Sequence, residues 1–285
     1  MNEDRMVTAR VVTIGGIEIG EGRPLALIAG PCVIESEGLA LEVAREVSRI
    51  ARSLRVPYIF KSSYLKDNRL SAGAYAGPGA EAGLGVLARV RDAVGVPVLS
   101  DVHCREEVEA AARVLDALQI PAFLCRQTRL LEEAARAGKP LNIKKGQFMA
   151  PDDMGRIAEK AAACGNRSIL LTERGSSFGY QNLVVDMRSI PIMRGLGYPV
   201  VFDATHSVQL PGTAGGASGG EPEFVPTLAR AACAAGCDAL FIETHPDPRK
   251  ALSDARSMVP LGELRALLER VVEIAAIVRG KDGCP

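Results

Sequence analysis

The sequence predicts a (β/α)8 barrel, and three observations support this fold class. Eight short apolar runs alternate with eight stretches of helical periodicity along the chain. The runs are apolar without interruption, as in parallel strands that are buried on both faces. The length of 285 residues suits a barrel of this kind, which typically needs roughly 250 residues. An open doubly wound sheet is less consistent, because Gly30-Pro31-Cys32 stands where such folds usually carry G-x-G-x-x-G.

The predicted elements follow one another in strict alternation. Strands are expected at 25–29, 57–60, 97–100, 121–124, 140–143, 168–172, 199–203 and 239–243. Helices are expected at 39–54, 81–94, 105–118, 129–137, 152–163, 186–195, 223–235 and 261–278. Apolar residues recur every three or four positions in the helical stretches, which gives each helix one buried face. We expect residues 1–285 to form a single barrel domain.

A short hairpin is predicted ahead of the barrel, within residues 8–20. Two strand-like runs flank Gly15-Gly16, and glycine readily adopts the positive φ of a tight two-residue turn. We expect this hairpin to cap the bottom of the barrel.

Composition excludes several classes of protein. Because 34 Lys+Arg balance 34 Asp+Glu, bulk charge cannot drive binding to nucleic acid or to a membrane surface. No apolar run approaches the roughly 20 residues that span a bilayer, and the first residues, MNEDRM, do not resemble a signal peptide. The seven cysteines are scattered without a CxxC pair, which indicates neither a disulfide framework nor a zinc finger. We therefore expect a cytoplasmic protein.

Ionisable side chains follow nearly every predicted strand, and the active site of such a barrel lies at that end. The cations there are Lys61, Lys66, Arg69, Arg126, Lys144 or Lys145, and Arg174. Any one of them alone is best interpreted as a solvated surface charge. Together they indicate a strongly anionic ligand, with phosphate and carboxylate as the obvious groups. Because the total charge is balanced, we expect the compensating acids mostly on the helix faces and at the bottom.

A second set of residues at the same end has the chemistry of metal ligands. The set is Cys32, His206, Glu243 and Asp254. Thiolate, imidazole and two carboxylates suit zinc or iron(II). Ligands so far apart in sequence are not diagnostic, so a small buried cysteine and a hydrogen-bonded histidine remain alternative interpretations.

Long motifs in the chain resemble 3-deoxy-D-manno-octulosonate 8-phosphate synthases. They are LIAGPCVIES, FKSSYLKDNRLS, IPAFLCRQT, NIKKGQF, LTERGSSFGYQNLVVDMRS, FDATHSVQLPG and ETHPDPRKALSDA, in this order between Leu25 and Leu261. This family is a (β/α)8 barrel, usually a tetramer. It condenses phosphoenolpyruvate with D-arabinose 5-phosphate to give an eight-carbon sugar acid phosphate and inorganic phosphate, and the product enters lipopolysaccharide synthesis in Gram-negative bacteria.

The resemblance implies the metal-dependent branch of that family. The branch with Asn after the first strand needs no metal, whereas the branch with Cys needs a divalent ion, and this chain has Cys32. The implied ligands are Cys32, His206, Glu243 and Asp254. The implied ion is zinc, iron(II), manganese or cobalt.

The resemblance also implies roles for individual residues. Positions that hold phosphoenolpyruvate match Lys61, Ser63, Lys66, Gln119, Lys144 and Arg174. Positions that contact the pentose phosphate match Asn68 and Arg69, a sugar-hydroxyl contact matches Asp101, and Arg126 matches an arginine that reaches the active site of a neighbouring subunit in the homotetramer. The candidate catalytic residues are Lys66, Asp101, His206 and Cys32, and the proton donor is Lys66 or a water on the metal. The family usually has Ser-Ser where this chain has Leu70-Ser71.

Three other functions fit part of the pattern. The related 3-deoxy-D-arabino-heptulosonate 7-phosphate synthase, which takes erythrose 4-phosphate, shares the metal set but usually has Lys-Pro-Arg-Thr-Ser at residues 66–70. A Schiff-base aldolase could use Lys61 or Lys144, but the gathered cations need no Schiff base to explain them. A non-catalytic barrel that binds phospho-sugars leaves the Cys/His/Glu/Asp set unexplained.

Overall fold

The computed structural model describes residues 11–69, 71, 73–212 and 219–280. Within these residues, eight parallel strands form a closed barrel, because β11 pairs with β14 as well as with β8. The barrel strands are β3 (Ala26–Gly30), β4 (Tyr58–Lys61), β5 (Val98–Asp101), β6 (Ala117–Ile120), β7 (Leu141–Lys144), β8 (Ile169–Glu173), β11 (Val200–Asp203) and β14 (Ala239–His245). The predicted (β/α)8 barrel is confirmed.

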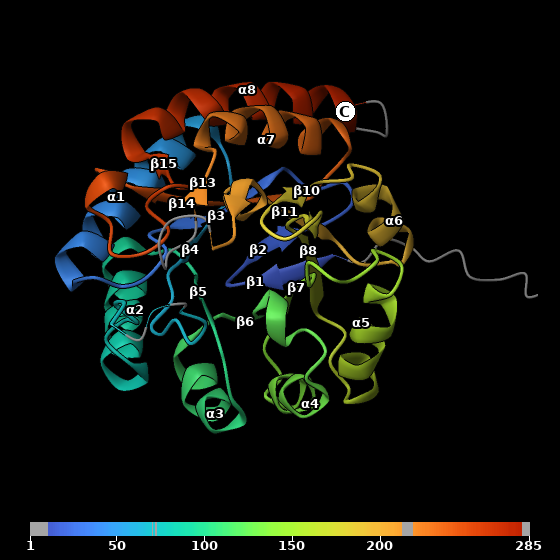
Figure 1. Cartoon of the computed structure of the whole chain (residues 1–285), viewed down its shortest axis with the longest axis horizontal. Helices are drawn as coiled ribbons and strands as arrows, with labels where there is room; N and C mark the ends of the chain where they lie inside the picture. The colour runs from blue at the N-terminus through green and yellow to red at the C-terminus, as the bar shows by residue number, and fades with distance from the viewer. Residues whose placement is uncertain (1–10, 70, 72, 213–218, 281–285) are drawn as a thin grey trace, which may run out of the picture.

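Helices surround the barrel in sequence order (Figure 1). They are α1 (Glu37–Leu54), α2 (Ala80–Val94), α3 (Arg105–Val114), α4 (Thr128–Arg136), α5 (Met154–Ala163), α6 (Ser189–Gly195), α7 (Val225–Ala234) and α8 (Leu264–Arg279). Helix α1 shows how they are delimited. The Ser36 side chain accepts a hydrogen bond from Leu39 N at its start, and Arg55 ends it in the left-handed conformation. Among the described helices, none combines the length and apolar character that crossing a membrane requires.

Short elements decorate the loops between these strands and helices. The short strands are β9 (Ser176–Ser177), β10 (Leu183–Val184), β12 (Gln209–Leu210), β13 (Gly219–Gly220) and β15 (Val259–Pro260). The 3-10 helices are η1 (Ala122–Leu124), η2 (His206–Val208), η3 (Pro222–Phe224), η4 (Pro248–Lys250) and η5 (Leu261–Glu263). Most of them lie in the loops at the carboxyl ends of the strands.

The fourth barrel strand differs from the prediction. The sequence pattern places it at 121–124, after a longer helix, but α3 ends at Val114 and β6 spans Ala117–Ile120. Pro121 has no N–H to donate to a neighbouring strand, so it ends β6 and starts the 3-10 helix η1. The assignment was wrong because Gln119 interrupts the apolar run of the true strand.

Inward-facing side chains fill the barrel in two chemically different layers. A lower layer is apolar and consists of Ile59, Leu99, Ala117, Leu170, Val201 and Ala239. Two residues further along a strand the side chain returns to the same face. At five of these six positions stand buried polar residues, namely Lys61, Asp101, Gln119, Thr172 and Asp203, and the sixth, after Ala239, is the apolar Phe241. The polar layer therefore lies at the carboxyl ends of the strands, where the active site was predicted.

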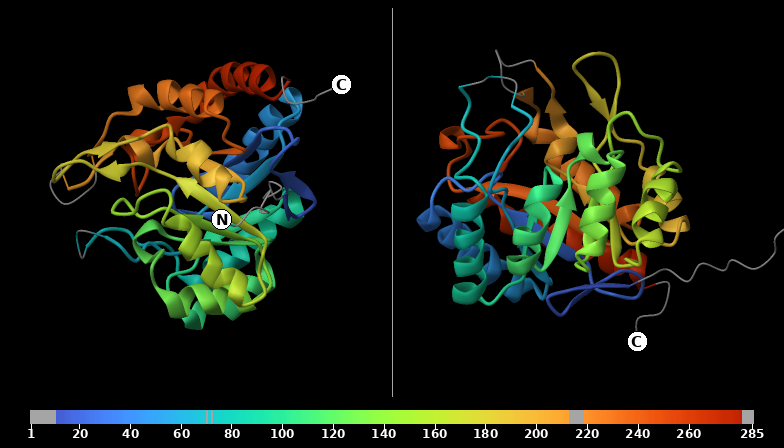
Figure 2. Two further views of the ribbon diagram at one scale, coloured as in Figure 1. Left: turned by 90° about the vertical axis from the view of Figure 1, so that its right-hand side faces the viewer. Right: turned by 90° about the horizontal axis from the view of Figure 1, so that it is seen from below.

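The N-terminal hairpin closes the lower end of the barrel. Strands β1 (Val12–Ile14) and β2 (Ile17–Ile19) pair antiparallel around Gly15-Gly16, which both have positive φ. Val12, Ile14 and Ile19 are buried in the same cluster as the lower barrel layer. In the right-hand view of Figure 2 the hairpin, in dark blue, lies below the strands, and the long loops lie above them. The predicted cap is confirmed, and residues 8–10 of its predicted range lie outside the described residues.

Shortening Ile14 tests how much this cap stabilises the fold. Ile14→Ala is expected to lower the free energy of unfolding by about 2–5 kcal/mol, because it removes buried methyl groups and leaves a cavity. Urea titration followed by circular dichroism measures this change. The matched control is Thr13→Ala, on the exposed face of the same strand, which should change stability by less than about 0.5 kcal/mol. Equal losses in the two variants would contradict a packed cap.

Candidate active site

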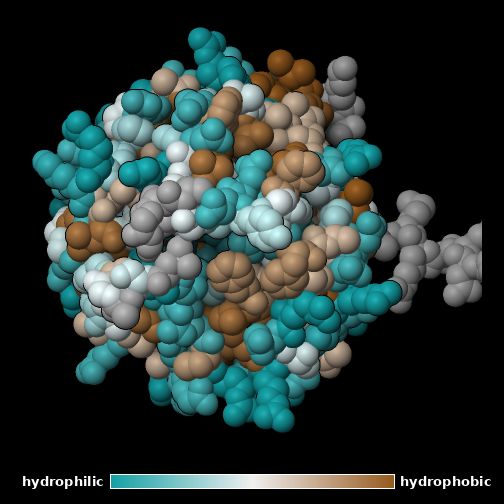
Figure 3. Space-filling view, in the orientation of Figure 1, coloured by the Kyte–Doolittle hydropathy of each residue, from teal (hydrophilic) through white to brown (hydrophobic). Residues whose placement is uncertain are grey.

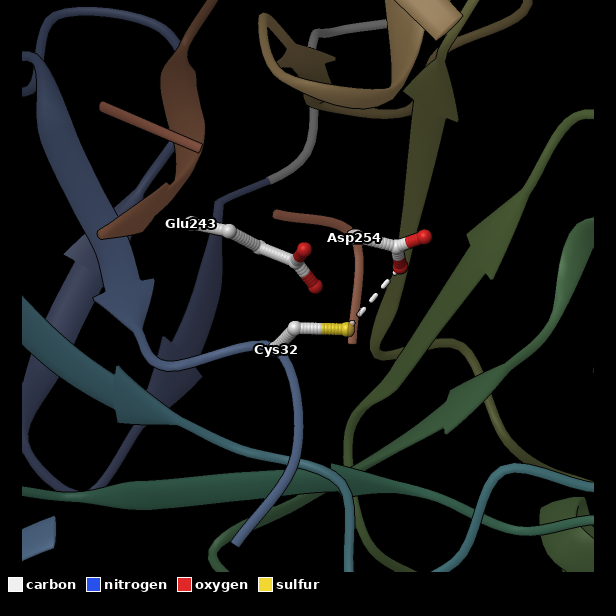
Figure 4. Close-up of side chains that lie close together, drawn as sticks. All are labelled: Cys32, Glu243 and Asp254. Carbon is white, nitrogen blue, oxygen red and sulfur yellow. Dashed lines mark hydrogen bonds between the residues drawn. The ribbon is translucent and has the colours of Figure 1, made fainter. Parts of the chain in front are cut away.

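The four predicted metal ligands meet above the polar layer of the barrel. Cys32 follows β3, Glu243 lies on β14, and ligand atoms of Cys32, Glu243 and Asp254 lie within 4.8 Å of one another. Figure 4 shows the sulfur and the two carboxylates directed toward a common point. His206 joins them, since its Nε2 lies 3.5 Å from Glu243 Oε1 and 3.8 Å from Asp254 Oδ2.

The donor set fits a divalent metal ion. Both carboxylate oxygens of Glu243 are buried without a hydrogen-bond partner, which is a costly state for an anion unless a cation balances it. Burial, reinforced by Asp254 and Glu243, raises the pKa of the Cys32 thiol. A bound cation would oppose these effects and favour the thiolate. Sulfur, imidazole and carboxylate together match the preferences of zinc and its neighbours in the first transition row.

Asp254 is held in an unusual backbone conformation. Its φ is +47°, in the left-handed region that few residues other than glycine adopt. The Cys32 thiol donates a hydrogen bond of 2.9 Å to Asp254 Oδ2. Although burial works in the opposite direction, Lys66 and His206 help lower the pKa of Asp254 to about 2. The carboxylate is therefore charged and aimed at the cluster.

Asp203 is a buried acid of the site that the sequence analysis missed. Its Oδ2 lies 2.8 Å from His206 Nδ1 and 2.6 Å from Lys144 Nζ. A carboxylate beside Nδ1 keeps the ring proton there, which leaves the Nε2 lone pair facing Glu243 and Asp254. The available signal was an acidic residue in the last position of a barrel strand.

The cations of the mouth lie close to the metal-type cluster. Lys61 Nζ lies 3.3 Å from Asp101 Oδ1, and both Lys61 and Lys66 lie 3.9 Å from Glu243 Oε1. Together with the pair of Lys144 and Asp203, these contacts show that acidic side chains also lie inside the mouth. They are a few of the 34 acidic residues, so the expectation that the compensating acids lie mostly on the helix faces and at the bottom stays a prediction. Lone buried cations are too costly to leave without nearby acids.

The choice between Lys144 and Lys145 is resolved by the alternation of the strand. Lys144 lies inside the barrel, with Nζ 4.0 Å from the centre of the Phe241 ring. Lys145 is on the opposite face, where it pairs with Glu173 at 3.5 Å and donates to Ser176 Oγ. Lys144 is therefore the residue available to a ligand, and Lys145 links the ends of β7 and β8.

Asp101 is held by a hydrogen-bond network at the end of β5. Ser63 Oγ donates to its Oδ1, and Lys61 Nζ donates to Ser63 Oγ at 2.7 Å. His103 Nε2 lies 3.1 Å from Asp101 Oδ2. Burial opposes the charged ring, but hydrogen bonds to Asp101 and Glu107 raise the pKa of His103 to about 9. Asp101 is therefore an oriented acceptor at the rim of the site.

Two guanidinium groups offer donors that no described residue uses. Arg174 NH2 donates to Gln209 Oε1 at 3.0 Å, whereas its NH1 is buried without a partner. Arg69 donates through Nε to Tyr75 O, and its NH2 is likewise buried without a partner. Unpaired N–H groups of this kind are suited to phosphate or carboxylate oxygens.

Three other predicted substrate-binding residues lie neither in the metal-type cluster nor among the paired cations. Gln119 is buried inside the barrel, where its Oε1 accepts from Asn142 Nδ2. Asn68 is exposed on the loop after β4, and the neighbouring Leu70 lies outside the described residues. Arg126 is exposed between η1 and α4, and no contact joins it to the cluster in the described part of the chain.

Comparison with known proteins agrees with this arrangement. A profile of the DAHP synthetase I family matches residues 5–279. The chain belongs to this family. A family relative from Geobacter sp. (strain M21), named 2-dehydro-3-deoxyphosphooctonate aldolase, is 58% identical over 269 residues, which cover 94% of this chain and 98% of the relative.

Other members of the family with the same name are similarly close. The protein from Trichlorobacter lovleyi is 58% identical over 94% of this chain and 98% of its own length. The protein from Geobacter sulfurreducens is 54% identical over 95% of this chain and 99% of its own length. Because this name denotes the same enzyme as 3-deoxy-D-manno-octulosonate 8-phosphate synthase, the resemblance predicted from the motifs is confirmed.

Replacing Asp203 tests its control of His206. Asp203→Asn is expected to weaken Zn²⁺ binding by about 10–100-fold, because the amide no longer holds the ring proton at Nδ1. Competition with a chromogenic chelator measures the affinity. The control is Asp238→Asn, which alters a buried aspartate that accepts from Val200 N and should change stability but not Zn²⁺ affinity. Unchanged Zn²⁺ affinity in Asp203→Asn would refute the role.

Proposed function

We propose that this enzyme condenses phosphoenolpyruvate with D-arabinose 5-phosphate and water, giving 3-deoxy-D-manno-octulosonate 8-phosphate and inorganic phosphate. The observation that carries the proposal is the mouth itself, where Lys61, Lys66 and Lys144 gather beside the Cys/His/Glu/Asp cluster. The names of the relatives, at 54–58% identity over almost the whole chain, support this substrate pair.

The reaction explains why the mouth combines several cations with the oriented acceptor Asp101. C3 of phosphoenolpyruvate bonds to the aldehyde carbon of the sugar, water adds to C2, and the bond from C2 to the phosphate oxygen breaks. Two anionic substrates repel each other, so fixed cations are needed to hold them in reacting geometry. A divalent ion bound by Cys32, His206, Glu243 and Asp254 would supply Lewis acidity for the aldehyde or for the attacking water.

The proposal assigns the mouth residues to the two substrates. Phosphoenolpyruvate is held by Lys61, Ser63, Lys66, Gln119, Lys144 and Arg174. Asn68 and Arg69 hold the sugar phosphate, and Asp101 accepts from a sugar hydroxyl. The proton donor is Lys66 or a water on the metal. Burial opposes the charge of Lys66, but Cys32, Glu243 and other acids outweigh burial and raise its pKa.

One observation bears on the Schiff-base alternative. Burial and the neighbouring Lys61 lower the pKa of Lys144, as an amine nucleophile requires. The 2.6 Å contact with Asp203 nevertheless favours the ammonium form. Borohydride trapping with substrate distinguishes a Schiff-base aldolase from the proposed synthase, because only a Schiff base leaves a stable adduct on the protein.

We also propose that the enzyme works as a homotetramer in the cytoplasm. Arg126 is exposed, and Phe123 (54% exposed) lies nearby on η1 while Phe148 (57% exposed) follows β7. Exposed aromatic residues are typical of protein interfaces, and Figure 3 shows hydrophobic side chains among the hydrophilic ones on one face. Arg126 would then complete the site of a neighbouring subunit. The described cysteines are free thiols, as expected in a reducing compartment.

Substrate choice is the direct test of the proposal. Phosphate release from phosphoenolpyruvate is expected to be faster with arabinose 5-phosphate than with erythrose 4-phosphate, by at least about tenfold in kcat/KM, because the shorter sugar cannot make the same contacts. A coupled phosphate assay measures both. A preference for erythrose 4-phosphate would instead support the alternative synthase.

Metal dependence can be tested at Cys32. Cys32→Ser, or treatment of the enzyme with a chelator, is expected to remove most activity while circular dichroism shows an intact fold, because a metal ligand or the metal is lost. Cys104→Ser, which alters an exposed thiol, is the matched control and should retain activity. Full turnover of the chelated, metal-free enzyme would refute the metal site. Cys32→Asn would then show whether metal-free chemistry is latent in this barrel.

A further inference from the structure

Three side chains on neighbouring strands form a hydrogen-bonded chain inside the barrel. They are Gln119 on β6, Asn142 on β7 and Thr172 on β8, and all three are buried. Gln119 and Asn142 are partners in the strand register. Asn142 Nδ2 donates to Gln119 Oε1 at 3.0 Å, and Thr172 Oγ1 donates to Asn142 Oδ1.

The direction of this chain follows from the acceptor that the Thr172 hydroxyl uses, Asn142 Oδ1. A carbonyl oxygen only accepts and an amide nitrogen only donates. With the Thr172 hydroxyl donating to Asn142 Oδ1, the nitrogen of Asn142 must face Gln119, and it can be satisfied only by the carbonyl oxygen of that residue. Reversal of one amide alone would set two donors or two acceptors against each other in a buried position, which is strongly disfavoured. Reversal of both amides would let the Thr172 hydroxyl accept from Asn142 Nδ2, but its hydrogen would then lose Asn142 Oδ1, its acceptor among the described residues.

The chain ends at a nitrogen that is left for a ligand. Gln119 Nε2 makes no hydrogen bond to a described residue. It is also not one of the polar atoms that are both fully buried and without a partner, which means that solvent reaches it. It therefore faces the mouth, in the same layer as Asp101 and Lys144. Because Oε1 is taken by Asn142, Gln119 presents only N–H donors to whatever binds there.

We propose that Asn142 and Thr172 are positioning residues that lock the Gln119 amide as a donor toward the mouth and so select an anionic group at that point. This inference rests on the proposed function, in which the group is a phosphate or carboxylate oxygen of phosphoenolpyruvate. A freely rotating Gln119 amide would have to be turned and ordered by the anion itself, at a cost in binding free energy that the locked amide avoids.

Packing alone does not account for these three residues. The inward positions directly below them on β6 and β8 are Ala117 and Leu170, which fill the barrel without polar groups. Apolar side chains of similar shape would fill the same space without requiring matched hydrogen bonds. The feature that the polar chain adds is the orientation of one amide.

Isosteric substitutions reverse or release that orientation. Asn142→Asp replaces the donor to Gln119 with an acceptor, so the Gln119 amide is expected to turn and present oxygen to the mouth. The Kd for phosphoenolpyruvate, measured by isothermal titration without sugar, should rise by about tenfold to a hundredfold. Thr172→Val releases the Asn142 amide and should raise the Kd by a smaller factor, and Thr172→Ser should recover most of that loss. The KM for the sugar phosphate should change much less.

A double-mutant cycle separates orientation from the added negative charge. If Asn142 acts through Gln119, then Asn142→Asp should have little further effect on the Kd in a Gln119→Met background. If the charge of the new carboxylate repels the substrate directly, the full effect should persist there, and the proposal is overturned. It is also overturned if Thr172→Val and Thr172→Ser bind phosphoenolpyruvate equally well.

A structural control and the wild type complete the experiment. Asn166→Asp alters another buried asparagine, which donates to Ala135 O and Lys139 O outside the mouth. It should lower the melting temperature without changing the Kd for phosphoenolpyruvate, and an equal change in Kd would assign the effect of Asn142→Asp to general loosening. Absence of phosphoenolpyruvate binding in the wild type would refute the proposed function, whereas wild-type binding with unaltered variants would refute only the positioning role.

Discussion

The burial of opposite charges side by side at the carboxyl ends of the strands is the constraint on which the rest of the site depends. Removing an ion from water costs several kcal/mol even after the protein relaxes. Lys61 beside Asp101 and Lys144 beside Asp203 each offset part of that cost. These pairs hold long side chains in single positions, so the ligand-binding groups are ordered by the same contacts that make their burial tolerable.

Glu243 breaks this pattern, and the exception is informative. Its carboxylate is buried, its nearest basic nitrogen is His206 Nε2 at 3.5 Å, and the two lysines around it are at 3.9 Å. The pairing is therefore looser at this residue than elsewhere in the layer. A divalent ion between Glu243, Cys32, His206 and Asp254 would supply the missing positive charge, so the electrostatics of the layer and the chemistry of the ligand set point to the same group.

The features that could be predicted from the sequence are those set by local pattern, such as the alternation of strands and helices, a turn of two glycines, or the residues that follow a strand. The barrel, the hairpin around Gly15-Gly16, the metal-type ligands and most of the cations belong to this group. β6 was misplaced because Gln119 makes a buried strand look polar. Asp203 and Asn142 were missed because their roles depend on which side chains face each other across neighbouring strands. The closure of the whole barrel decides that register, so it cannot be derived from the local sequence pattern.

The hairpin that closes the lower end also limits how small molecules reach the interior of the barrel. Val12, Ile14 and Ile19 pack below an apolar layer that already fills the barrel, so the interior is open only at the carboxyl ends of the strands. Small molecules that reach the depth of Gln119 must enter and leave past the same loops, including the one that carries Asn68 and Arg69. A ligand at that depth therefore has a single route in and out, at the end of the barrel opposite to the hairpin.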